Sequence, residues 1–320
     1  MNEYVKRGEK YLLGCVFDGL AHSFDVVSEE YVKPYPEVTG YLLKYFCDRN
    51  YIEEKIISAA NKLVSLQNEE TGGWPSFYDT HKLYTFDTAQ ILIGLCGLYE
   101  KTNDEHYLYA AIKGGDFLIK MQLDNGGFAP IYNCITKQKV IDDNIYDIWN
   151  GPFSGLMCKV TEAYQALFDV TGKKDYLTLK KKVVEFYISS KYIEYTHPLG
   201  YWLEGLYCAE RYDVIDSILQ EKVIPRIRKN GYIPYSEQLP YAYVSGVIQL
   251  GIILWKMGYK ELAILIRDYG RKVQEEHYSG GLFQYANEYG ELDSHVHTEI
   301  NSWGTKYFCE LELMIEEENV

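Results

Sequence analysis

The chain has 320 residues, of which 47% are hydrophobic and 24% are charged, and its formal net charge is −14. This composition is typical of an ordinary globular protein with enough apolar residues to build a core. Because nucleic acids and anionic membranes bind basic surfaces, the acidic balance argues against both as partners.

The start of the chain and its cysteines predict a cytoplasmic protein. Residues 1–7 lack the apolar stretch of a secretion signal. The longest apolar runs, at residues 91–98 and 247–255, are too short to cross a bilayer, so we expect no membrane insertion. The seven cysteines are scattered without Cys-x-x-Cys spacing, which predicts free thiols in a reducing compartment.

A short pattern recurs along the chain: an amphipathic stretch, a turn with glycine and an aromatic residue, an aromatic and polar segment, and a second apolar stretch. The turns lie at residues 71–74, 125–128, 199–201, 230–232 and 279–283. Repeated helix pairs bury their apolar faces only against neighbouring pairs, and many such repeats close around a central funnel. The pattern therefore predicts a ring of helix pairs.

Apolar periodicity predicts six outer and six inner helices. The outer helices are expected near residues 3–15, 51–67, 105–122, 174–190, 211–229 and 259–277. The inner helices, which are more apolar on all sides, are expected to begin near residues 40, 88, 154, 200, 243 and 300. The sixth pair forms only if the N-terminal helix packs beside the C-terminal one. We therefore predict an all-α fold, an (α/α)6 toroid, formed by one domain over residues 1–320.

The connections from outer to inner helices are long and alternate aromatic or β-branched residues with polar ones. They cover residues 74–86, 128–150, 232–241 and 282–298, and each is expected to form a small β-hairpin. The reverse connections are tight, as in antiparallel helix pairs. All the long connections therefore lie at one rim, at the starts of the inner helices, where structured loops on a rigid scaffold usually carry the function.

Acidic residues and histidines stand at these helix starts. The candidate catalytic residues are Glu37, Asp87, His197 and Glu299. One group that donates a proton and another that accepts it are sufficient for general acid–base chemistry. Structural roles stay open for three of them: Asp87 as a helix N-cap, Glu37 as a partner of the helix macrodipole, and His197 as a hydrogen-bonded rim residue.

The chain contains 32 tyrosines, many of them in the long connections. Tyrosine combines a ring face with a hydroxyl, which suits sugar rings and other amphipathic ligands, although a rigid packed rim is an equally simple explanation. The candidate substrate-binding residues, at or near the inner-helix starts, are Tyr35, Tyr41, Trp74, Tyr84, Gln90, Trp149, Tyr195, Tyr241, Tyr243, Gln249, His297, Trp303 and Lys306.

One group of residues has the types that bind metals. His295, His297 and Glu299 alternate along the chain, so on a strand they would share a face. No fourth ligand is evident, and no phosphate loop or dinucleotide fingerprint is present. We therefore predict neither a metal nor a cofactor.

Several segments resemble known toroid families. Residues 122–128, Gln-Leu-Asp-Asn-Gly-Gly-Phe, resemble the Gln-x-x-x-Gly-x-aromatic repeat of terpenoid cyclases and prenyltransferase-type toroids. Residues 86–95 resemble the inner helices of six-hairpin glycosidase-like proteins, including unsaturated glucuronyl hydrolases. Residues 35–41, 87–90 and 302–308 together are similar to uncharacterised bacterial proteins found with surface-polysaccharide genes. The resemblance implies the (α/α)6 fold and a role in glycan assembly or remodelling.

Two departures bear on the chemistry. The chain lacks the Asp-x-Asp-Asp acid of class II terpene cyclases and a rim cysteine suited to the prenyltransferase zinc. The likeness to glucuronyl hydrolases implies Asp87 as an acid, but the second aspartate of that family has no match, so hydrolase, lyase and epimerase chemistry stay open.

We predict a carbohydrate-active enzyme whose substrate is a sugar or oligosaccharide, such as one containing a uronic acid, held in the funnel. The alternatives are a terpenoid-type toroid that binds an isoprenoid, and a non-catalytic module that binds a glycan or a protein. An isoprenoid toroid predicts an almost wholly apolar funnel without paired carboxylates.

Overall fold

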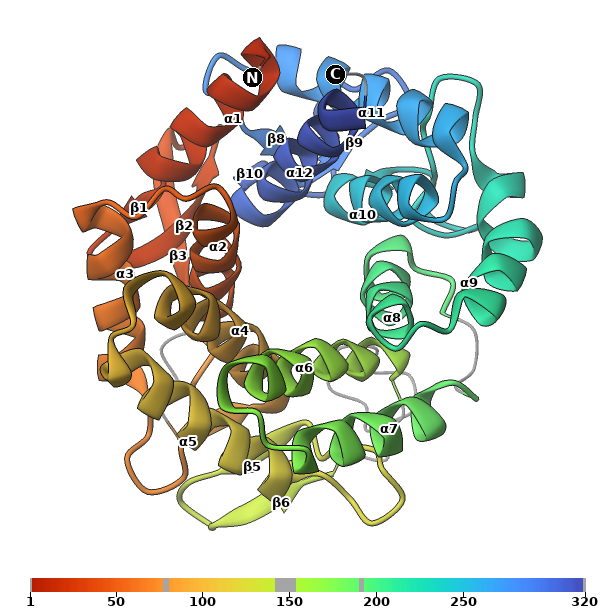
Figure 1. Cartoon of the computed structure of the whole chain (residues 1–320). Helices are drawn as coiled ribbons and strands as arrows, with labels where there is room; N and C mark the ends of the chain where they lie inside the picture. Colours follow the sequence, from red (N-terminus) through yellow and green to blue (C-terminus); the bar gives the residue numbers. More distant parts are fainter. Residues whose placement is uncertain (1, 77–80, 142–153, 190–192, 319–320) are drawn as a thin grey trace.

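The computed structural model describes residues 2–76, 81–141, 154–189 and 193–318. Its helices alternate between an inner and an outer ring around a common centre (Figure 1). The inner helices are α2 (Pro36–Asp48), α4 (Thr85–Thr102), α6 (Val160–Thr171), α8 (Thr196–Cys208), α10 (Val244–Lys256) and α12 (Ser302–Glu318). The outer helices are α1 (Glu3–Gly14), α3 (Glu54–Leu66), α5 (Glu105–Met121), α7 (Asp175–Tyr187), α9 (Tyr212–Ile218) and α11 (Lys260–Glu275). The predicted (α/α)6 toroid is confirmed.

The two rings differ in burial as their sequences predict. Every residue of α10 from 244 to 255 is buried, because this helix has neighbours on all sides. Helix α11 instead buries residues three and four apart, such as Ile266, Tyr269 and Val273, and exposes its charged face. The predicted outer helix at 211–229 is shorter than expected: after α9 the chain continues as a π-helical turn (Leu219–Val223) and a 3-10 turn (Ile224–Arg226).

Four predicted glycine turns are confirmed, and each joins its repeat to the next one. Their glycines have left-handed backbone, with φ of 83° at Gly72, 95° at Gly126, 83° at Gly231 and 81° at Gly280. Each lies against the next outer helix: a Cβ would come within 2.2 Å of Lys113 O, 2.4 Å of Lys182 O, 1.9 Å of Leu265 O and 2.7 Å of Arg7 O, respectively. A side chain at these positions would push the repeats apart.

The turn predicted at residues 199–201 is wrong, because these residues lie inside α8. Gly200 serves a packing purpose there. A Cβ on it would lie 2.9 Å from Cβ of Gln249, so glycine permits the close approach of α8 and α10.

The first and last helices lie side by side, and both ends of the chain are at the top of Figure 1. Nδ2 of Asn2, the N-cap of α1, donates a hydrogen bond of 2.8 Å to Oε2 of Glu312 on α12. A Cβ on Gly8 would lie 2.4 Å from Sγ of Cys309, which shows how closely the two helices approach.

Short strands connect the loops of the rim. They are β1 (Val16–Phe17), β2 (Leu20–Asp25), β3 (Glu30–Tyr35), β4 (Lys82–Tyr84), β5 (Ile131–Asn133), β6 (Gln138–Val140), β7 (Ala242–Tyr243), β8 (Leu282–Phe283), β9 (Tyr285–Ala286) and β10 (Glu299–Asn301). Strands β5 and β6 form a hairpin, as predicted for that connection. Several others pair between connections: β4 with β5, β7 with β9, and β2 with β10, all antiparallel. Strands β1–β3 were not predicted.

Two further expectations concern the chain as a whole. All seven cysteines are free thiols, as predicted. No helix in the described part of the chain is long and apolar enough to span a membrane.

Candidate functional site

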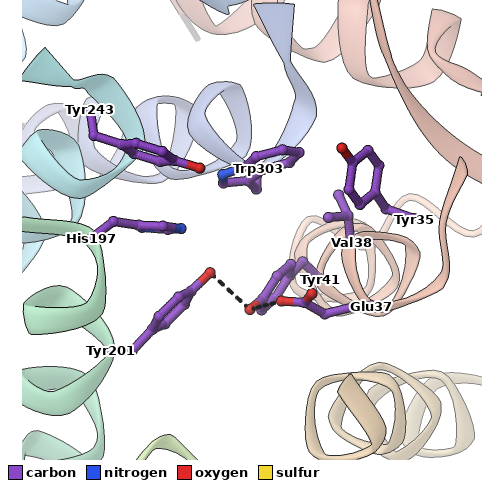
Figure 2. A pocket seen from close by; sticks show the side chains of 8 residues that line it. All are labelled: Tyr35, Glu37, Val38, Tyr41, His197, Tyr201, Tyr243 and Trp303. Atoms are coloured by element: carbon purple, nitrogen blue, oxygen red, sulfur yellow. Dashed lines mark hydrogen bonds between the residues drawn. The ribbon is translucent and has the colours of Figure 1, made fainter. Parts of the chain in front are cut away.

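The N-terminal ends of inner helices enclose a cavity of about 100 Å³ at the rim. It is lined by Tyr35, Glu37, Val38, Tyr41, His197, Tyr201, Tyr243 and Trp303 (Figure 2). All of these except Val38 and Tyr201 are residues that the sequence singled out. The volume is below that of pockets for drug-sized ligands, so the cavity suits a single small ring. Its carboxyl, imidazole and hydroxyl groups differ from the wholly apolar funnel that an isoprenoid toroid predicts.

Glu37 is the second residue of α2 and is partly buried. One turn later Tyr41 donates a hydrogen bond of 2.7 Å to Oε1 of Glu37, and its hydroxyl lies 3.1 Å from that of Tyr201 (Figure 2). Burial, followed by the negative charge of Asp87, raises the pKa of Glu37 to about 8. At neutral pH Glu37 is therefore mainly protonated and can act as an acid.

Asp87 is the third residue of α4, and the helix N-cap is Tyr84, so the N-cap interpretation of Asp87 is wrong. Its side chain is buried, and burial raises its pKa to about 6 while a hydrogen bond from Ser76 opposes the rise. Oδ2 of Asp87 has no hydrogen-bond partner among the described residues. The environment thus raises the pKa of both carboxyl groups, and that of Glu37 more, so Glu37 is the better proton donor and Asp87 the better acceptor.

His197 is the second residue of α8 and is 2% exposed. Its ring stacks on Tyr243, with centroids 4.7 Å apart and planes 16° apart, and lies 4.6 Å from the ring of Tyr201. Nδ1 is hydrogen bonded to Oε1 of Gln249. Burial lowers the pKa of His197 to about 3, so the imidazole is neutral at physiological pH and one of its ring nitrogens is unprotonated.

Trp303 lines the rim cavity together with Tyr35. It is the second residue of α12, and its ring lies 5.3 Å from that of Tyr35. Its Nε1 is buried and has no hydrogen-bond partner within the described ranges, and Figure 2 shows the indole nitrogen on the cavity side. A buried donor without a partner is costly, so a ligand hydroxyl would be stabilised there.

A cluster of tyrosines leads outward from the cavity. This tyrosine wall comprises Tyr195, Tyr235, Tyr241, Tyr243 and Tyr285. Tyr243, which lines the cavity, lies 5.4 Å from Tyr235 and 4.9 Å from Tyr285, measured between ring centroids. Tyr285 in turn lies 5.1 Å from Tyr241 and 6.0 Å from His297, which is exposed. These ring contacts connect Tyr243 in the cavity wall to the partly buried Tyr241 and the exposed His297.

Three predicted binding residues have other surroundings. Trp74 is fully buried and its Nε1 donates to the carbonyl of Leu63 at 2.7 Å, so it belongs to the core. Gln90 is buried in α4, and its Nε2 lacks a hydrogen-bond partner among the described residues. Tyr84 is the last residue of β4 and is partly buried. Trp149 lies outside the described residues.

Glu299 and His297 lie in the loop and strand before α12, outside the cavity lining. His297 Nδ1 is 3.5 Å from Oε1 of Glu299. No group of three or more histidine, cysteine, aspartate or glutamate side chains in the described part of the chain is arranged to hold a metal ion.

A second cavity, of about 500 Å³, lies at the opposite ends of the inner helices. Lys306 lines this cavity rather than the first, because it is more than one turn into α12. Its Nζ is 2.8 Å from Glu310 and 4.1 Å from the centre of the Tyr307 ring. A second buried lysine, Lys159, pairs with Glu204 at 2.8 Å. Neither Glu204 nor Lys159 was singled out from the sequence.

The raised pKa of Glu37 predicts how stability depends on pH. The folded protein holds this proton up to about pH 8, whereas an unfolded glutamate loses it near its ordinary pKa of 4.5. Stability from this group is therefore present below pH 4.5 and is lost at up to about 1.4 kcal/mol per pH unit as pH rises through 8. Glu37→Gln, which stays neutral, should exceed the wild type in melting temperature at pH 8–9 but not at pH 4.5.

Calorimetry across this pH range tests the prediction. Glu288→Gln, at an exposed site, is the control and should follow the wild type at every pH. Equal melting temperatures for Glu37→Gln and the wild type at pH 9 would contradict the raised pKa.

The chain matches no family model, and no curated protein matches it. Solved structures do match it over nearly its whole length. A cellobiose 2-epimerase from Spirochaeta thermophila superimposes with a TM-score of 0.76 at 13% identity, covering 98% of each chain. A cellobiose 2-epimerase from Bacillus thermoamylovorans gives 0.74 at 12% identity over 100% of each chain. An unsaturated glucuronyl hydrolase specific for heparin gives 0.67 at 10% identity, covering 99% of this chain and 97% of that one. At these identities the likeness shows that the chain has the (α/α)6 toroid fold of these enzymes.

Proposed function

We propose that the protein is an enzyme that transfers protons to and from a sugar or short oligosaccharide bound in the rim cavity. The observation that carries the proposal is an aromatic-lined cavity with Glu37 in its wall and a second buried carboxyl group, Asp87, whose charge acts on Glu37 and raises its pKa. The names of the similar structures, which include sugar epimerases and a glucuronyl hydrolase, support a sugar as the substrate.

The residues divide into acid and base. Glu37 donates a proton to a sugar oxygen, and Asp87 and the neutral His197 are the groups that can accept one. In epimerisation or elimination, the accepted proton comes from the carbon next to a carbonyl or carboxylate carbon. Nε1 of Trp303, a buried donor without a partner among the described residues, donates a hydrogen bond to the sugar.

Hydrolysis is the second candidate reaction. Two carboxyl groups with opposite protonation states can also cleave a glycosidic bond, with one protonating the leaving oxygen and the other activating water. A place for either reaction in surface-polysaccharide assembly is part of the proposal and rests on the sequence resemblance described above.

A screen in two steps tests the function. Neutral and uronic-acid mono- and disaccharides are first tested for a rise in the melting temperature of the wild type. Those that bind are then incubated in D2O with wild type and with Asp87→Asn, and the products are followed by NMR. Deuterium on a sugar carbon, with wild type only, supports proton transfer at carbon. New reducing ends without deuterium support hydrolysis when both products are saturated, and support elimination when one product is an unsaturated sugar. Binding without any turnover, or no binding at all, would contradict an enzyme of this class.

The tyrosine wall predicts a preference for longer substrates. Tyr241 lies beyond the cavity and is only partly buried, so it can stack on a second sugar unit but not on one held inside. Tyr241→Ala should raise KM for a disaccharide roughly tenfold, about 1.4 kcal/mol, and leave KM for the matching monosaccharide unchanged.

Steady-state kinetics on both sugars tests this, with the exposed Tyr289→Ala as the control. If Tyr241→Ala raises both KM values equally, the wall does not provide a second subsite.

A further inference from the structure

A line of buried polar side chains connects the rim cavity to the second cavity. It consists of His197, Gln249, Glu204 and Lys159, and we call it the polar relay. Nδ1 of His197 is hydrogen bonded to Oε1 of Gln249, whose Nε2 lies 3.2 Å from Oε2 of Glu204. Nζ of Lys159 lies 2.8 Å from the same Glu204 oxygen. All four side chains are buried, and Gln249 is fully so. Such an ordered line of donors and acceptors has only a few consistent proton arrangements.

The chemistry of Lys159 and Glu204 fixes the direction of these hydrogen bonds. An ammonium group only donates and an ionised carboxylate only accepts, so Oε2 of Glu204 accepts from Lys159 and from Gln249. Gln249 must therefore turn its NH2 group towards Glu204 and its carbonyl oxygen towards His197. A carbonyl oxygen bonds only to a donor, which places the proton of His197 on Nδ1.

Packing holds the Gln249 amide in this place. A Cβ on Gly200 would lie 3.0 Å from Oε1 of Gln249, so the glycine leaves just enough room for the amide between α8 and α10. Ser245, with Oγ 3.4 Å from Nδ1 of His197, is a competing partner for this nitrogen. A hydroxyl both donates and accepts, so Ser245 adapts to either tautomer and does not choose between them.

We propose that Gln249, Glu204 and Lys159 are positioning residues that hold His197 in the tautomer with its proton on Nδ1, so that Nε2 faces the cavity as a hydrogen-bond acceptor. Figure 2 shows the imidazole directed into the cavity between Tyr201 and Tyr243. The tautomer itself follows from the fold, whereas its use as a base rests on the proposed function. The opposite tautomer would present a donor to the substrate and could not accept its proton.

The tautomer can be measured without any substrate. In full-length protein with ¹⁵N-labelled histidine, long-range ¹H–¹⁵N correlations at pH 7 distinguish a protonated Nδ1 from a protonated Nε2, and His197→Gln identifies the signals of His197. The wild type should show the proton on Nδ1. Gln249→Met removes the acceptor, so His197 should shift to the Nε2-protonated form that free imidazole side chains favour. Ser245→Ala should keep the wild-type tautomer.

A wild-type His197 protonated on Nε2, or one whose tautomer is the same in Gln249→Met, would overturn the relay. The wild-type spectrum is decisive even if Gln249→Met does not fold. Activity is a separate readout: once a substrate is known, Gln249→Met should lower kcat at least about tenfold with little change in KM. An Nδ1-protonated His197 in a protein that turns over no sugar would uphold the relay and overturn the proposed function. A wild type that turns over a sugar while His197 is protonated on Nε2 would uphold the proposed function and overturn the relay.

Discussion

Replacing Asp87 by asparagine is expected to lower kcat by a factor of about 10²–10⁴, the usual contribution of a group in general acid–base catalysis. Two effects combine. The variant loses a proton acceptor, and it loses the negative charge that helps to keep Glu37 protonated. The second effect has its own signature: the pKa of Glu37 should fall, so the alkaline limb of the pH–rate profile should move to lower pH.

The measurement is kcat and KM from pH 5 to 9, on the sugar that the screen identifies. For the wild type we expect a bell-shaped profile, with a rise near pH 6 as Asp87 ionises and a fall near pH 8 as Glu37 loses its proton. Asp116→Asn, at an exposed position on α5, is the matched control and should match the wild type. An unchanged kcat in Asp87→Asn would exclude Asp87 from the chemistry.

Gly40→Ala is expected to lower the free energy of unfolding by about 1–3 kcal/mol or more, because it overpacks the contact of α2 and α4. A Cβ on Gly40 would lie 2.6 Å from Cα of Ile91 and 2.8 Å from the carbonyl oxygen of Gln90. These are backbone atoms, so no side-chain rotation can relieve the contact. Activity should fall too, because Glu37 and Asp87 each stand one turn before this contact and move apart when the helices separate.

Thermal denaturation and kcat/KM measure the two effects. Gly14→Ala is the control, because this glycine is also helical but a Cβ on it would meet nothing closer than the Tyr31 hydroxyl at 3.7 Å. It should be as stable as the wild type or slightly more so. If Gly40→Ala were equally well tolerated, the close approach of α2 and α4 would not be what brings the two carboxyl groups together.

Much of the fold could be predicted because its signals are local. The turn glycines at 72, 126, 231 and 280 stand beside aromatic residues at each repeat, and the left-handed backbone they need is a property of a few residues. Gly200 misled the prediction, because a glycine that admits a neighbouring side chain looks the same in sequence as a glycine in a turn.

The rim strands were harder to predict because their partners lie far away. Strand β2 pairs with β10, across most of the chain, and a two- or three-residue strand has no periodicity of its own. One local signal was present: Asp18-Gly19, both with positive φ, links β1 to β2, and this dipeptide is a strong hairpin signal.

The candidate site residues could also be predicted where the signal is local, and not where it depends on distant partners. Glu37, His197 and Trp303 line one cavity because each is the second residue of an inner helix, a position that the sequence marks. Lys306 is three residues further into its helix and lines the other cavity, since the depth of a side chain along the funnel depends on the exact helix start. Glu204 was missed because nothing in the local sequence marks it as buried. Its partners, Lys159 and Gln249, come from other helical segments and lie far away in the sequence.

The pairing of the first and last elements also affects how the chain folds. Strand β2 needs β10, α1 needs α12, and the turn at Gly280 needs the backbone of Arg7. Contacts of such high sequence separation form late, because a long loop must close before they contribute. On the ribosome, seven of the eight residues that line the rim cavity emerge before Trp303, so a nascent chain has this wall exposed until α12 is made. The protein should therefore refold slowly and depend on protection of this exposed wall during synthesis.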